Sequence, residues 1–213
     1  FDFLMLEQKE KGRAHNKFNQ NETNSDWEIL NNAKKTSVFK GYDKTYLQTD
    51  LVKFRFLGND KVEIVLKETP FYAESGGQIG DVGTIESKGF IFNVENTYYE
   101  GEEICHLGII EQGKIDQLKN KKVDAIINNS RRRRIKLNHT GTHLLHKALK
   151  EVLGNHVQQA GSLVADDRLR FDLTHYQKIS NDELLEIENI INKIIRKNIL
   201  LEVFSKNFED AKK

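Results

Sequence analysis

The feature that most constrains the fold is a change of hydrophobic period near residue 130. From about residue 36 onward, short runs rich in Val, Ile, Leu and Phe alternate with turn clusters such as "GND" and "SGGQIGDVG". The runs are "LVKFRF", "KVEIVLK", "GFIFNVE", "EICHLGII" and "KKVDAII". Strands at this spacing, with little helical periodicity between them, predict a small antiparallel β-barrel over residues 36–130.

After residue 131 the pattern becomes mixed. Helical spacing relates Leu144, Leu145, Ala148, Leu149 and Val152, and Gly154 then supplies a stop. "RLRFDL" and "ILLEVF" are typical of strands, and between them Ser180 and Glu183 have the spacing of a capping box. The helix that follows this box should carry Leu184, Ile187, Ile191, Ile194 and Ile195 on one face. Residues 131–213 are therefore predicted to form an α+β domain.

Residues 1–35 contain good helix formers in "LEQKEKGRA", followed by the polar stretch "NQNETNS", which should end the helix. We predict a connecting helical segment here, so the whole chain is expected to be α+β in three parts. The chain begins at Phe1 and stops within the charged stretch "FEDAKK". We expect it to be a piece of a longer protein.

Composition excludes several classes of protein. Lys and Arg number 33 against 32 Asp and Glu, for a net charge of +1, so no global field attracts nucleic acid or membrane. No run of 18 apolar residues and no signal peptide occurs, which predicts a soluble, cytoplasmic chain with no membrane partner. Cys105 is the only cysteine, which rules out an internal disulfide and a zinc site with two cysteines from this chain.

Three histidines lie in the predicted helix "NHTGTHLLHKAL". His139 and His143 are four residues apart, so both imidazoles should lie on one helical face and can hold a single metal ion. A metalloprotease H-E-x-x-H motif is excluded because Thr140 follows His139 and no carboxylate lies between the pair. Spacing alone leaves open that these are ordinary polar residues of a half-buried helix.

Two long motifs together carry a family resemblance. "LNHTGTHLLHKALKEVLGNHVQQAGSLVADDRLRFDL" (137–173) and "ETPFYAESGGQIGDVGTI" (68–85) resemble the alanyl-tRNA synthetases, in the region after the aminoacylation domain. "LEQKEKGRA" is similar to the helix that leads into that region. The resemblance implies an editing β-barrel followed by the N-terminal part of the zinc-dependent editing domain.

The resemblance also implies a chemistry. His139 and His143 would be zinc ligands, completed in the family by a downstream Cys-x-x-x-His pair, so the site would be incomplete in this piece and the piece by itself inactive. The complete enzyme would attach alanine to tRNA(Ala) with ATP and Mg²⁺, both used outside these residues. The editing region would hydrolyse mischarged Ser-tRNA(Ala) and Gly-tRNA(Ala). The implied substrate pocket contains Thr142, Gln159 and Ser162, while His146 is expected to pack or to support the ligands.

The glycine-rich loop "SGGQIGDVG" matches neither the P-loop order nor G-x-G-x-x-G opening a helix, so nucleotide binding here is not expected. Its four glycines, Gly76, Gly77, Gly80 and Gly83, are expected to supply positive-φ positions in a hairpin loop. The resemblance places the loop near the editing site, with Gln78 and Asp81 as candidate polar contacts.

Basic residues cluster around Arg131, Arg132, Arg133 and Arg134. Such a run is often a solvated face, but in a tRNA-handling domain it becomes a candidate phosphate contact, extended by Arg168 and Arg170.

Cys105 and His106 are adjacent in a predicted strand, where neighbouring side chains point to opposite faces. We therefore predict a buried thiol there and no joint metal site.

Two alternative functions remain. A free-standing trans-editing deacylase shares the barrel and the H-x-x-x-H helix, although the N-terminal segment is not expected in it. A non-catalytic tRNA-binding or connecting module is the other. Threonyl-tRNA synthetase editing domains also have an H-x-x-x-H helix, but the "GGQIGD" motif is not expected there. Neither oligomeric state nor the role of the metal follows from the sequence.

Overall fold

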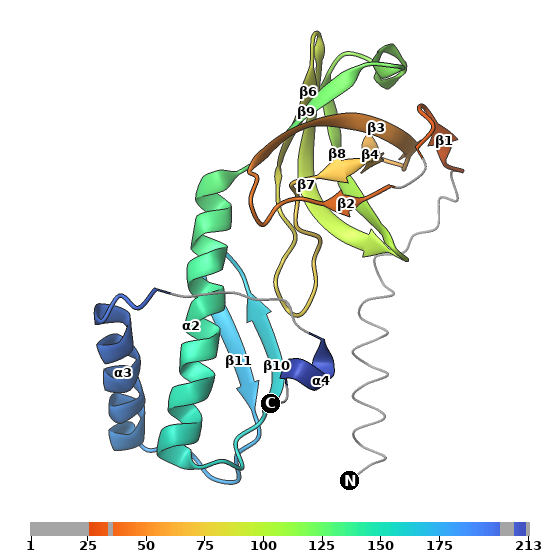
Figure 1. Ribbon diagram of the computed structural model, residues 1–213. Coiled ribbons are helices and arrows are strands. Elements are labelled where there is room, and N and C mark those ends of the chain that lie inside the picture. The colour runs from red at the N-terminus through yellow and green to blue at the C-terminus, as the bar shows by residue number, and fades with distance from the viewer. Residues whose placement is uncertain (1–25, 34–35, 201–206, 212–213) are drawn as a thin grey trace, which may run out of the picture. The chain divides into compact units, whose positions relative to one another are not determined.

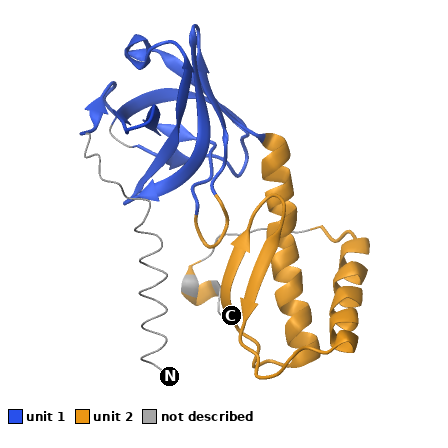
Figure 2. Ribbon diagram, turned by 180° about the vertical axis from the view of Figure 1, so that it is seen from behind, with its two compact units in different colours: residues 1–74, 80–128 blue, residues 75–79, 129–213 orange. Residues whose placement is uncertain are grey.

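The computed structural model describes residues 26–33, 36–200 and 207–211. These residues form two compact units, coloured separately in Figure 2. The first unit contains the described residues up to Glu74 together with Gly80–Asn128, and the second contains Ser75–Ile79 and the described residues from Asn129 onward. The predicted α+β class is confirmed, because a β-barrel is followed by helices and a small sheet.

The first unit is an antiparallel barrel (Figure 1). Its six strands follow one another in the order β3-β4-β8-β7-β6-β9, and β9 closes the barrel by pairing with β3. The short β1 adds to β3, and β2 pairs in parallel with β5. The elements are β1 Glu28–Ile29, β2 Val38–Phe39, β3 Tyr46–Phe56, β4 Lys61–Leu66, β5 Glu68–Thr69, β6 Gly83–Ser87, β7 Phe90–Glu100, β8 Glu103–Gln112, the 3-10 helix η1 Ile115–Leu118 and β9 Lys122–Ile127.

All five β runs read from the sequence are strands. Strand β6 was not among them, and its first residue, Gly83, is the last residue of the predicted glycine-rich loop. Gly76 and Gly77 have positive φ values of 59° and 84°, as predicted. Gly80 and Gly83 do not, so that expectation was wrong for them. A Cβ at Gly80 would lie 2.0 Å from the carbonyl oxygen of Thr97, and one at Gly83 would lie 2.1 Å from that of Ile126, so close backbone approach requires glycine there.

Register shifts let the long strands bend around the barrel. In β3, Leu51 pairs with Leu66 and Lys53 with Val65, so Val52 is an extra residue. The alternation of inward and outward side chains therefore changes at this point, and both Leu51 and Phe54 are buried. A similar shift between Val94 and Asn96 bends β7.

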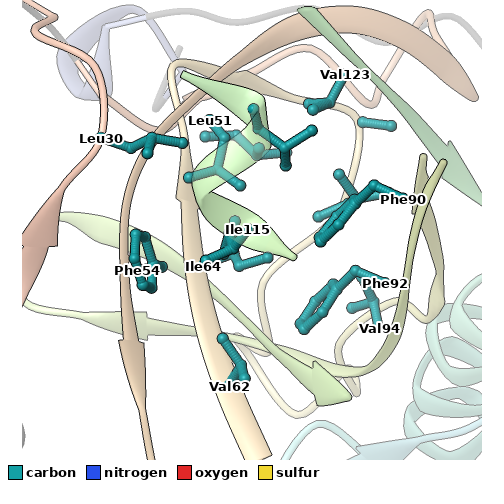
Figure 3. Close-up of a cluster of buried hydrophobic side chains, with 14 of the residues drawn as sticks. Leu30, Leu51, Phe54, Val62, Ile64, Phe90, Phe92, Val94, Ile115 and Val123 are labelled. Carbon is teal, nitrogen blue, oxygen red and sulfur yellow. The ribbon is translucent and has the colours of Figure 1, made fainter. Parts of the chain in front are cut away.

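Aromatic and branched side chains fill the barrel, and Figure 3 shows Phe90 and Phe92 among them. Phe90, Phe92, Ile64 and Leu51 are each fully buried. Burial of one such side chain contributes about 1.5–3 kcal/mol, so this cluster is the main source of barrel stability. Val123 and neighbouring residues of β9 belong to the same cluster, which ties the closing strand to the rest.

In the second unit, helix α2 (Asn129–Leu153) packs against α3 (Asn181–Arg196) and against the antiparallel pair β10 (Gln159–Val164) and β11 (Leu169–Leu173). A four-residue helix, α4 (Phe208–Ala211), follows. Gly154 ends α2 with a φ of 111°. The capping box at the start of α3 is confirmed, since the Ser180 side chain accepts a hydrogen bond from the Glu183 backbone and the Glu183 side chain accepts one from Ser180.

The apolar face of α3 is only partly covered within the described residues. Ile187 is buried against Ala148 and Leu149 of α2, whereas Leu184 and Ile195 are 49% and 57% exposed. Residues 1–25 and 34–35 of the predicted connecting segment lie outside the described residues, as does most of the predicted strand "ILLEVF". Glu28 and Ile29 of that segment form strand β1.

Candidate functional site on the histidine helix

His139 and His143 lie one turn apart on α2, as their spacing predicted. Their ring centroids are 5.1 Å apart, and the ring planes are inclined by 30°. Both residues are exposed. The pKa of His139 is nevertheless lowered, mainly because its ring is partly shielded from solvent and to a smaller extent because of the charge of His143. A lowered pKa favours the neutral imidazole, which is the form that donates a lone pair to a metal ion.

The loop Ser75–Ile79 belongs to the same unit as this helix, although it lies between two barrel strands in the sequence. Val164 of β10 holds the loop on both sides: its amide donates to the carbonyl oxygen of Gly77 at 2.7 Å, and its carbonyl oxygen accepts from the Ile79 amide at 3.1 Å. Gln78, between these two contacts, is 7% exposed. Its Oε1 lies 2.6 Å from Nδ1 of His139.

Gly77 permits this docking. It has a positive φ, and a Cβ at this position would lie 2.5 Å from the carbonyl oxygen and 2.6 Å from Oγ of Ser162. A side chain there would therefore collide with β10 as well as strain the backbone. The structure thus brings loop residues Ser75–Ile79, Ser162 and His139 into one unit.

The three side chains predicted for the substrate pocket lie on α2 and β10. Thr142 is buried, and its hydroxyl donates to the carbonyl oxygen of Asn138 at 2.9 Å, one turn earlier in the helix. Gln159 and Ser162 are joined to each other, because Nε2 of Gln159 donates to Oγ of Ser162 at 3.2 Å. Helix α2 contacts β10, and all three side chains belong to the second unit.

His146, the third histidine of the helix, is half-buried and lies with its ring centroid 5.2 Å from that of Phe171 on β11. Its Nε2 is buried and forms no hydrogen bond within the described part of the chain. This position is consistent with packing, which was one of the two roles expected for it.

Zinc fits the donor atoms of the pair, because imidazole nitrogen is one of its preferred ligands and the two rings lie close together. His139 and His143 are the side chains that would hold it. Within residues 26–33, 36–200 and 207–211, no group of three or more His, Cys, Asp or Glu side chains is arranged to hold a metal ion. The pair thus supplies two of the three or four protein ligands that zinc sites require.

Asp81, the other loop residue predicted near the site, lies in the barrel unit. Its carboxylate accepts a hydrogen bond from the Tyr72 amide at 2.8 Å, and its carbonyl oxygen accepts one from the Thr97 hydroxyl at 2.9 Å. Asp81 is 2% exposed, so within its own unit it fixes the backbone of the segment that leads into the loop.

The arginine run is partly paired with acid. Asp166 lies 3.3 Å from Nε of Arg131 and 3.0 Å from Nη2 of Arg134, and the hydrogen bond from Arg134 lowers the pKa of Asp166. Arg132 is buried, whereas Arg133 is exposed. Among the other predicted contacts, Arg168 and Arg170 are exposed and pair with Asp167 and Asp172, respectively. Sequence reasoning missed Asp166, because nothing in its spacing from the arginines signals the contact.

Cys105 and His106 are both buried in β8. Burial raises the pKa of the Cys105 thiol to about 12, so at neutral pH the thiol stays protonated and unreactive. This confirms the buried thiol that the sequence predicted. His106 lies inside the barrel, where its ring contacts the ring of Phe71 at a centroid distance of 5.2 Å.

Comparison with known proteins places this architecture in a family. Residues 1–131 match the family model described as tRNA synthetases class II (A), which covers the barrel and the first residues of α2. The chain therefore belongs to the class II (A) tRNA synthetase family. Within it, the chain is part of, or related to, alanine--tRNA ligase.

Three relatives support that relationship. The chain is 43% identical over 219 residues to the alanine--tRNA ligases of Thermoanaerobacter sp. (strain X514) and of Thermoanaerobacter pseudethanolicus (strain ATCC 33223 / 39E), with 96% of this chain and 24% of each relative covered. It is 40% identical over 221 residues to the enzyme of Pseudoalteromonas translucida (strain TAC 125), with 100% of this chain and 24% of the relative covered. The chain thus spans about a quarter of the length of these curated relatives.

The described helices were also compared with the requirements of a membrane span. None of them, within the part of the chain that the structure describes, has both the length and the apolar character needed to cross a bilayer.

Proposed function

We propose that this chain is the editing region of an alanine--tRNA ligase and that it hydrolyses the ester that joins serine or glycine to tRNA(Ala). The observation that carries the proposal is the pair His139 and His143, which lie one turn apart on α2. This helix belongs to the same unit as the loop Ser75–Ile79, whose buried Gln78 contacts His139. The relationship to alanine--tRNA ligases over nearly the whole chain supports it. The division into residues 1–35, 36–130 and 131–213, and a cytoplasmic location, belong to the same proposal.

The reason for a second active site is chemical. A pocket that accepts the methyl side chain of alanine cannot strongly reject the same group carrying a hydroxyl, since binding discriminates by only about 10²-fold in such cases. Glycine, which is smaller, also fits the pocket. Hydrolysis of the wrong ester removes both errors after attachment.

The hydrogen bonds within the second unit suggest how serine is recognised. The hydroxyl hydrogen of Thr142 is donated to Asn138, so Oγ1 can only accept from a substrate hydroxyl. Ser162 accepts from Gln159 and therefore keeps its own hydrogen for donation. The three side chains Thr142, Gln159 and Ser162 thus offer both an acceptor and a donor to a seryl hydroxyl, and alanine would leave these groups unpaired.

His139 and His143 would hold Zn²⁺, which when bound can polarise an ester carbonyl group or lower the pKa of a water molecule to about 7. The lowered pKa of His139 keeps this side chain neutral and able to bind at physiological pH. Gln78 holds the ring of His139 in place through its side-chain oxygen. The ATP-dependent attachment of alanine, with its Mg²⁺, is assigned to the rest of the ligase.

The proposed partner is tRNA(Ala). Arg133 and Arg134 are both exposed, and Arg133 is the first candidate for a phosphate contact because Arg131 and Arg134 share their charge with Asp166. Phosphate contacts release counterions, so the affinity for tRNA should fall steeply as salt rises.

Deacylation of Ser-tRNA(Ala) and Gly-tRNA(Ala) tests the proposal. It is measured with the chain itself and with a ligase of the relatives' length that contains it. In the ligase, His139→Gln should abolish deacylation and leave alanine attachment intact. His156→Gln, which replaces an exposed histidine on the same unit, is the matched control and should retain activity. Unchanged deacylation by the His139→Gln ligase would refute the assignment of this helix.

A further inference from the structure

We propose that Gln78 is a positioning residue that holds the proton of His139 on Nδ1 and so leaves Nε2 as the nitrogen with a free lone pair. The inference rests on the proposed function of the same site and deepens it. It assigns to the glycine-rich loop a task that its sequence, which fits no nucleotide-binding motif, does not suggest.

The first step of the argument is the chemistry of the contact. The atom of Gln78 that faces Nδ1 of His139, at 2.6 Å, is the carbonyl oxygen Oε1, which can only accept a hydrogen bond. Nδ1 must therefore be the donor. A neutral imidazole carries one proton, so Nε2 of His139 is left as the acceptor or ligand nitrogen. Histidines that bind metals commonly donate their other N–H to an oxygen in this way.

The second step is that Gln78 cannot easily move away. Its backbone lies beside Val164, and its amide and carbonyl groups form reciprocal hydrogen bonds with Ser75 at 3.0 and 3.1 Å. Gly77 lets the loop approach Ser162 more closely than any side chain would allow. The backbone that carries the Gln78 side chain is therefore held in place. The side-chain amide is also buried, and a buried amide needs a hydrogen-bonding partner.

The third step is the contrast with the neighbouring histidine. Within the described part of the chain, the side chain of His143 forms no hydrogen bond and its ring contacts the ring of His139. Its tautomer is therefore set by solvent, whereas that of His139 is set by Gln78. His143 serves as an internal control in the same molecule.

The test is the tautomer of His139 in the metal-free protein, read from long-range ¹⁵N–¹H NMR spectra. The signals are assigned by their loss in His139→Gln. In the wild-type chain we expect the Nδ1–H form. Gln78→Leu and Gln78→Met remove the acceptor oxygen and should shift His139 toward the Nε2–H form, while Gln78→Glu keeps an acceptor oxygen and should retain Nδ1–H. Two variants without this oxygen are used so that poor folding of one leaves the other to decide.

Two controls separate a local effect from a general disturbance. His143 should keep the same tautomer in all the Gln78 variants, although its signals can shift slightly because its ring contacts that of His139. Gln158→Leu, which replaces an exposed glutamine of the same unit, should leave His139 as Nδ1–H. If His139 keeps Nδ1–H in both Gln78→Leu and Gln78→Met, the proposal is wrong.

A second readout is Zn²⁺ affinity, measured by titration of the ligase that contains this region. Loss of such an orienting partner typically weakens metal binding by about 10–100-fold, and we expect this for Gln78→Leu, with Gln78→Glu close to wild type. An unchanged affinity in Gln78→Leu would contradict the proposal. If the tautomer shifts as expected but the ligase does not deacylate Ser-tRNA(Ala), the positioning role stands and the proposed function fails.

Discussion

His106 should make the barrel sensitive to mild acid. The ring is fully buried, and both of its nitrogens are used: Nδ1 donates to the carbonyl oxygen of Ile64 at 2.9 Å, and Nε2 accepts from the Thr69 hydroxyl at 2.8 Å. The Thr69 oxygen already accepts from the Phe71 amide at 3.1 Å. A second ring proton would therefore displace the Thr69 hydrogen and place a charge in an apolar core.

The magnitude follows from the two pKa values. Burial lowers the pKa of His106 from 6.5 to about 4. As pH falls, the unfolded chain binds a proton before the folded chain does, so stability is lost between pH 6.5 and about 4. At about 1.4 kcal/mol per pH unit the total loss is about 3–4 kcal/mol, of which about 2 kcal/mol occurs between about pH 7 and pH 5.

The assay is urea unfolding at several pH values, followed by the fluorescence of Trp27. This is the only tryptophan of the chain, and its ring lies 4.4 Å from Nζ of Lys53 and 4.3 Å from the Arg55 guanidinium carbon, so it reports on the barrel unit. The matched variant is His106→Gln, whose amide does not titrate and can both donate and accept hydrogen bonds.

Carboxylates titrate in both proteins, so the decisive quantity is the difference between the two pH dependences. The free energy of unfolding of the wild type should fall by about 2 kcal/mol more than that of His106→Gln between about pH 7 and pH 5. Parallel curves would refute the reasoning, because they would mean that the buried ring does not resist protonation.

Three further predictions concern packing, the loop and the arginine run. Phe92→Ala should lower the free energy of unfolding of the barrel by about 3–5 kcal/mol, measured by Trp27 fluorescence, and a loss below about 1 kcal/mol would show that the core is not tightly packed there. Gly77→Ala should weaken loop docking, seen as faster hydrogen exchange of the Val164 amide, while Gly76→Ala, with open space at its Cβ position, should have the smaller effect. Asp166→Asn should remove the negative charge beside Arg131 and Arg134 and tighten tRNA(Ala) binding with a steeper salt dependence; unchanged binding in a filter assay would place the tRNA elsewhere.

Local rules account for the elements that the sequence predicted. Short runs of β-forming residues between turn clusters identified the five barrel runs, and Ser180 with Glu183 marked the start of α3, because these signals depend only on neighbours in the chain. β6 was missed because its residues follow directly on a glycine-rich stretch. The requirement for glycine at positions 80 and 83 comes from close contact with other strands, which the spacing along the chain does not reveal.

The sequence by itself determined the β-barrel, the α+β class and the His139–His143 pair, since each follows from the spacing of β-rich runs and turn clusters or from helical spacing along the chain. Only the tertiary structure decided that Gln78, 61 positions away, lies against His139 and that Asp166 lies against the arginines. Contacts between residues so distant in sequence depend on how strands and loops pack, and packing is set by shape and burial over the whole unit rather than by any local pattern.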